Sequence, residues 1–157
     1  MNNFHKAYYD HLVAIHNRLR YELRHCLHTL PNCSQQSSLR STLHKVLQFS
    51  SHLQGHHDLE EAIIFPAFAK VTDISHWSHS HEELHSTLDK VRMLARDGLD
   101  QKVEDFTENK SKLVEELQNL SDIVLPHLTD EEVLSHPSET IKLWPTEKDM
   151  RRAFPWM

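Results

Sequence analysis

Histidine and carboxylate side chains recur in this chain at a spacing that places them on one face of a helix. In three segments, two such residues are separated by four positions, which on an α-helix puts the second about one turn, roughly 6 Å, above the first. A fourth segment contributes a single histidine. These residues are His16, His56 with Glu60, His81 with His85, and His127 with Glu131. Imidazole and carboxylate groups gathered in this way are typical ligands of a metal such as iron or manganese.

The polar residues are in phase with the apolar positions of each segment. In the last segment Leu117, Leu120 and Val124 step by three and four, and His127 and Glu131 continue the series. An ionisable group on the core face of a helix costs several kcal/mol unless it is paired or bound to a metal. The same phase occurs in the other three segments, so chance placement among fifteen histidines does not explain it. The pattern predicts a metal site inside a helical bundle.

Length and composition favour a single all-α domain. The chain has 157 residues, enough to bury its own core, and only two glycines and six prolines, too few for a turn-dense β fold. We expect an up-down-up-down four-helix bundle with a di-metal site in its core, over residues 1–136, and a tail over 137–157 that packs on the bundle. The expected helices run from Phe4 to Leu30, Leu39 to Pro66, Ile74 to Ala95 and Leu99 to Leu134.

Glycine and proline positions add local expectations. Gly55 stands inside the second helix, where it would allow close approach of a neighbouring helix, and Gly98 would supply a left-handed cap after the third. Pro66 is expected to kink the second helix or to start a new short turn, and Pro126 to bend the fourth beside His127.

Several classes of function are disfavoured. The net charge of −6 argues against nucleic acid as a partner, because that binding is driven by clustered Lys and Arg. No apolar run approaches the roughly 18 residues of a membrane span, and the first residues lack the features of a signal peptide, so we expect a cytoplasmic protein without a membrane partner. We interpret Cys26 and Cys33 as reduced thiols, and expect a monomer or small homo-oligomer.

Two other metal motifs overlap the same residues. His81-Glu82-Glu83-Leu84-His85 has the H-E-x-x-H form of zinc hydrolases, but that interpretation leaves the other three segments unexplained. The Glu-x-x-His pattern of ferritin-type sites occurs at Glu22/His25 and at Glu82/His85. Glu22 and His25 lie off the apolar face of their segment, and the in-phase set is rich in histidine rather than carboxylate.

The segment L-Q-G-H-H-D-L-E-E-A-I-I-F-P, from Leu53 to Pro66, resembles the signature of hemerythrin-like (HHE) proteins. The resemblance extends to H-N-R-L-R, to H-E-E-L-H and to L-P-H-L-T-D-E-E, and it covers roughly residues 10–135. The whole pattern looks most like the single-domain fungal-type members of that family.

The resemblance implies a non-haem di-iron centre (Fe²⁺/Fe³⁺) with an oxo or hydroxo bridge, manganese being the alternative metal. Carried over by position, His81, His85 and His127 would bind one iron, His16 and His56 the other, and Glu60 and Glu131 would bridge them. Four residues leave alternatives open: His11 competes with His16, Glu132 with Glu131, and His57 and Glu61 duplicate His56 and Glu60 one position along.

The function implied is binding of, or reaction with, dioxygen or peroxide, in oxygen binding, sensing or iron handling. The alternative is a di-iron oxidase or oxygenase, an oxidoreductase that acts on a small organic substrate. A cavity beside the metal site, large enough for more than a diatomic ligand, would distinguish the two. Trp144, Phe154 and Trp156 in the tail are candidates for its lid.

Overall fold

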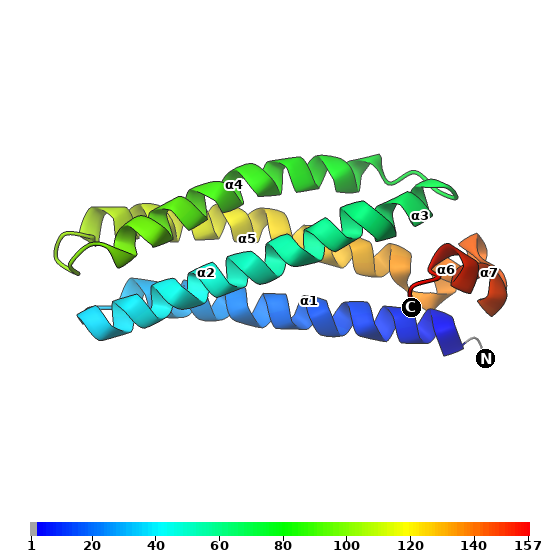
Figure 1. Cartoon of the computed structure of the whole chain (residues 1–157), viewed down its shortest axis with the longest axis horizontal. Coiled ribbons are helices and arrows are strands. Elements are labelled where there is room, and N and C mark those ends of the chain that lie inside the picture. Colours follow the sequence, from blue (N-terminus) through cyan, green and yellow to red (C-terminus); the bar gives the residue numbers. More distant parts are fainter. Residues whose placement is uncertain (1–2) are drawn as a thin grey trace.

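The computed structural model describes residues 3–157, which form helices and no strand. Four long helices lie side by side and alternate in direction (Figure 1). They are α1 (Asn3–Thr29), α2 (Gln36–Leu59), α4 (Ser75–Leu99) and α5 (Thr107–Ser135). Both α2 and α5 pack against α1 and against α4. This arrangement confirms the predicted up-down-up-down bundle.

Short elements connect and extend the long helices. A 3₁₀ turn, η1 (Leu30–Asn32), links α1 to α2. A π-helical turn, η2 (Glu60–Ile64), follows α2 and leads into α3 (Phe65–Ala69). After α5 come α6 (Pro137–Leu143) and α7 (Glu147–Ala153). None of the helices within residues 3–157 is both long and apolar enough to cross a membrane.

Of the two outcomes expected at Pro66, the structure has the new short helix, and the irregular turn lies before it. The π turn η2 holds one wide turn of backbone, and it leaves Pro66 in the first turn of α3, where the missing N–H of proline is tolerated. The residues at both ends of η2, Glu60 and Ile64, are buried. A π turn inside a helix is frequently found at functional sites, and this one carries Glu60.

Two apolar clusters fill the bundle, one on each side of the predicted ligands. The larger consists of aliphatic side chains from all four long helices, including Leu23, Leu53, Leu88 and Leu117. The smaller is aromatic and lies at the end of the bundle where α6 and α7 pack (Figure 1). Along the chain, His16, Glu60 and His81 each stand between a residue of one cluster and a residue of the other.

The aromatic cluster joins the tail to the bundle. The Phe68 ring lies 5.1 Å from the Trp144 ring and 6.0 Å from the Phe154 ring, and Tyr8 stacks on Phe154 at 5.1 Å. Trp144 and Phe154 are buried, whereas Trp156 is exposed. The tail therefore closes this end of the bundle through two of its three large aromatic residues.

The structure corrects both glycine predictions. Helix α4 continues to Leu99, and no glycine in the described chain has a positive φ, so Gly98 is not a left-handed cap. A Cβ at Gly98 would lie 2.7 Å from Cζ of the buried Phe106, whereas a Cβ at Gly55 would meet nothing within 4 Å. The close approach thus occurs at Gly98 and not at Gly55. Phe106 contacts Gly98 from the loop of residues 100–106. Because of this loop, α5 begins at Thr107 and not at Leu99 as expected.

We expect Gly98→Ala to destabilise the protein by about 1–3 kcal/mol, because the new methyl group overpacks against Phe106. Gly55→Ala is the matched control and should stabilise it by about 0.5–1 kcal/mol, since the site is open and alanine favours the helix. Urea unfolding followed by circular dichroism measures both. A Gly98→Ala protein at least as stable as wild type would contradict the packing described here.

Candidate metal centre

The four long helices and η2 bring histidine and glutamate side chains together in one buried layer. Two groups of potential ligands form there, and within each group one atom per residue lies within 4.8 Å of the others. The first group, the His16 group, consists of His16, His56, Glu60 and Glu131. The second, the His81 group, consists of His57, Glu60, His81 and His127. Glu60 belongs to both groups, so they form one continuous centre.

The imidazole nitrogens have the separations of ligands on a common ion. Nε2 of His16 lies 3.1 Å from Nε2 of His56, and Nε2 of His81 lies 2.9 Å from Nε2 of His127. Two ligands at right angles on an ion with bonds of about 2.1 Å are about 3 Å apart. Each pair therefore matches neighbouring ligand positions on a metal ion.

Each buried carboxylate directs one oxygen at both groups. Oε1 of Glu131 lies 3.6 Å from Nε2 of His16 and 3.4 Å from Nε2 of His127. Oε1 of Glu60 lies 3.2 Å from Nε2 of His56 and 3.6 Å from Nε2 of His81. A carboxylate in that position can bind one ion or bridge two.

Several of these buried atoms have no hydrogen-bond partner within residues 3–157. They are Oε1 of Glu60, Oε1 of Glu131 and both ring nitrogens of His57. A buried polar atom without a partner costs about 1–3 kcal/mol, and more if it is charged. A cation bound between them would satisfy both carboxylate oxygens and one ring nitrogen of His57, so the residues fit a metal.

Burial keeps the histidines in the form that binds metals. It lowers the pKa of His16 to about 2, of His127 to about 3 and of His56 to about 4, and neighbouring imidazoles add to the effect. The pKa of His57 is lowered for the same reasons. All four rings are therefore neutral near pH 7, as metal coordination requires.

The pKa values of the two buried carboxyl groups are shifted in the opposite direction. Burial raises the pKa of Glu60 well above its ordinary value, and the neighbouring Glu131 carboxylate raises it further. Burial likewise raises the pKa of Glu131. Two carboxylates in one apolar layer resist ionising together unless a positive charge lies between them. With the histidines neutral, a metal cation is the charge that this layer lacks.

In the structure His57, and not His85, forms a ligand group with His81 and His127. Nε2 of His85 lies 3.4 Å from Oε1 of Glu61, outside both groups, and the side chain is 34% exposed. The His57 ring is buried and stacks on the His81 ring at 4.0 Å. Spacing alone did not distinguish His56 from His57, because His56 lies three residues after Leu53 and four before Glu60, and His57 lies four after and three before.

The other residues left open by the sequence lie around the centre or away from it. Glu61 and Glu132 each approach a histidine of the centre from outside: Oε1 of Glu61 lies 3.0 Å from Nδ1 of His81, and Oε2 of Glu132 lies 3.5 Å from Nδ1 of His16. His11 is exposed.

The two alternative motifs do not form sites. Glu22 of the ferritin-type pattern accepts hydrogen bonds from Arg18 and bonds to His52, away from both ligand groups. In the H-E-x-x-H motif, Glu82 is exposed and His85 does not join His81 in a ligand group.

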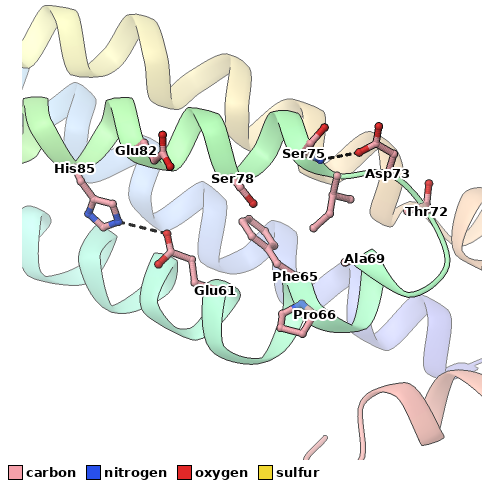
Figure 2. Close-up of a pocket in the computed structure, with 11 residues that line it drawn as sticks. Glu61, Phe65, Pro66, Ala69, Thr72, Asp73, Ser75, Ser78, Glu82 and His85 are labelled. Carbon is pink, nitrogen blue, oxygen red and sulfur yellow. Dashed lines mark hydrogen bonds and ion pairs between the residues drawn. The ribbon is translucent and has the colours of Figure 1, made fainter.

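A surface groove of about 960 Å³ lies beside the centre, between η2, α3 and the first half of α4. Figure 2 shows Glu61 and His85 together at one side of this groove, with Phe65 and Ser78 further along it. The Phe65 ring packs on the His81 ring at 4.7 Å. Phe65 and Glu61 therefore stand between the groove and His81.

Comparison with known proteins identifies one family. The model of the hemerythrin HHE cation binding domain matches residues 7–137, which is most of the chain. The matched segment contains every residue of both ligand groups. No match was found among curated proteins or among solved structures.

The placement of His57 and His85 predicts different effects of substitution. We expect His57→Gln to lower the metal content by about one ion per chain, because the His81 group loses a buried ligand. His85→Gln, a change of the same kind outside both groups, should leave the content unchanged. Elemental analysis after gel filtration measures both, with circular dichroism to verify folding. Loss of metal in His85→Gln but not in His57→Gln would restore the ligand set predicted from the sequence.

Proposed function

The chain belongs to the family of hemerythrin HHE cation-binding domains, and on that premise we propose that its core holds two iron ions and reacts with dioxygen or peroxide. The observation that carries the proposal is the sharing of Glu60 by two groups of four ligands. Seven different residues contribute, more than a single ion of four to six ligands needs.

The composition of the ligand set supports iron, with manganese as the alternative. Five imidazoles and two carboxylates form the two groups, without a thiolate. Imidazole with carboxylate suits iron and manganese, whereas structural zinc and copper(I) sites favour sulfur. Carboxylates between the two groups also provide the anionic oxygen that two neighbouring cations require.

Bound iron would supply the redox chemistry and the affinity for dioxygen that side chains lack. The residues of the chain determine where a small ligand has room. The His16 group contributes two imidazoles and the His81 group three. Because the His16 group has one imidazole fewer, room for a small ligand would be expected on the side of His16 and His56. The apolar clusters on both sides of the layer exclude bulk water.

The proposal predicts close to two iron ions per purified chain, measured by elemental analysis. Loading the metal-free protein with iron should raise its melting temperature strongly, because the buried carboxylates gain a cation. A ligand at a concentration of 100 times its Kd stabilises the folded state by about 2.7 kcal/mol. Glu60→Ala and Glu131→Ala should both reduce metal binding. A single zinc ion per chain, or equal melting temperatures with and without metal, would contradict the proposal.

The groove of Figure 2 favours one second candidate, an oxidase or oxygenase acting on a small organic substrate. Its volume exceeds what a diatomic ligand needs, and Glu61 connects it to His81 by a hydrogen bond. In that case an organic molecule in the groove would lie beside the iron bound by the His81 group.

Filling the groove separates the two candidates. Ser78 is exposed and lines the groove, so Ser78→Trp would block it without touching the ligand groups. If dioxygen is the only ligand, the reduced variant and the reduced wild-type protein should change their optical spectra with dioxygen at equal rates in stopped-flow mixing. If an organic substrate is oxidised, a small-molecule cell extract should stimulate dioxygen consumption by wild type and not by the variant.

A further inference from the structure

Two glutamate doublets occupy equivalent places in the centre. Glu60-Glu61 lies at the start of η2, and Glu131-Glu132 lies near the end of α5. The first glutamate of each doublet is buried in the ligand layer. The second turns to the neighbouring helix and approaches a histidine of the centre from its outer side. The doublet on η2 reaches α4 in this way, and the doublet on α5 reaches α1.

Glu61 holds the outer nitrogen of His81. Its Oε1 lies 3.0 Å from Nδ1 of His81, and 3.4 Å from Nε2 of His85. The inner nitrogen of His81, Nε2, faces His127 and Glu60. With Nδ1 donating to Glu61, the ring is fixed in the tautomer whose Nε2 lone pair points into the ligand layer.

Glu132 approaches His16 from the corresponding side, at ion-pair distance and without a hydrogen bond to Nδ1. Its Oε2 lies 3.5 Å from Nδ1 of His16, while Nε2 of His16 faces His56 and Glu131. Arg20 fixes the carboxylate, because its guanidinium donates to both oxygens, at 3.0 Å to Oε1 and with a further bond to Oε2. Both Arg20 and Glu132 are largely buried, so solvent screens this arrangement little.

We propose that Glu61 and Glu132 are positioning residues that orient His81 and His16 for metal binding, each acting on a different ion. The inference rests on the proposed two-ion centre. An outer carboxylate keeps the proton on Nδ1, raises the basicity of the ligating nitrogen and prevents the ring from turning. Glu61 serves the ion of the His81 group, and Glu132 the ion of the His16 group.

Anaerobic titration of the metal-free protein with Fe²⁺, in competition with a chelator, tests this assignment. Glu61→Ala and Glu132→Ala should each lower the affinity for one of the two ions by about ten- to a hundredfold, the usual effect of losing such a partner. Glu61→Gln and Glu132→Gln retain an oxygen beside Nδ1 that can accept a hydrogen bond from it, so these variants should recover part of the affinity. An affinity that falls in the order wild type, Gln variant, Ala variant indicates a positioning role. Thermal melting of each metal-free variant verifies that it folds.

Matched controls remove one negative charge nearby without touching a ligand histidine. Glu83→Ala changes an exposed glutamate on α4, and Asp130→Ala an exposed carboxylate beside Glu131 on α5. Both should bind two ions within about twofold of wild type. In cobalt(II)-loaded protein, nuclear magnetic resonance should show one exchangeable imidazole N–H signal lost in each Ala variant and present in the controls.

The outcomes separate this inference from the proposed function. Wild type that binds two ions, together with Ala variants that bind them like the controls, would overturn the positioning roles and leave the two-ion centre intact. Wild type that binds a single ion would overturn the two-ion centre itself. If the Ala variants and the controls lose metal affinity equally, the loss is explained by net charge alone. That result would also overturn the positioning roles.

Discussion

Compensation of negative charge in an apolar interior is the constraint on which this structure depends. Glu60 and Glu131 lie in the middle of the bundle with an aliphatic cluster on one side and an aromatic cluster on the other. The histidines around them are held neutral by burial, which lowers their pKa values, so they cannot supply the opposite charge. Removing an ion from water costs several kcal/mol, against a total stability of about 5–15 kcal/mol for a domain. Metal binding and folding are therefore coupled in this chain.

That constraint explains features of the fold outside the centre. A cation can be shared only if the helices present their ligands at one level, and each of the four long helices contributes to the two ligand groups. The π turn η2 serves the same end, because it carries Glu60 into the layer and then lets α3 start at Phe65 with Pro66 in its first turn. Beyond it, Phe68 of α3 packs with Trp144 and Phe154, which directly follow α6 and α7, and closes the end of the bundle that lies nearest the centre.

The sequence predicted the bundle because helical periodicity records which face of each helix is buried. It also predicted a layer of ligands, since His16, Glu60 and Glu131 interrupt that face in phase. The difference between His57 and His85 was harder to predict, because both lie near the buried face and the outcome depends on the π turn and on Glu61. The close packing at Gly98 could not be predicted either, because it involves Phe106, which lies in a loop without hydrophobic periodicity.

The doublets connect charge compensation with ligand geometry. Two divalent ions would bring four positive charges, and Glu60, Glu61, Glu131 and Glu132 bring four negative charges when all are ionised. Only the first member of each doublet lies inside the layer, where desolvation is most costly. The second lies at the periphery and approaches a histidine on the adjacent helix, and Arg20 also pairs with Glu132. A single glutamate on η2 or α5 could not do both, because the inner and outer positions lie on opposite sides of an imidazole ring.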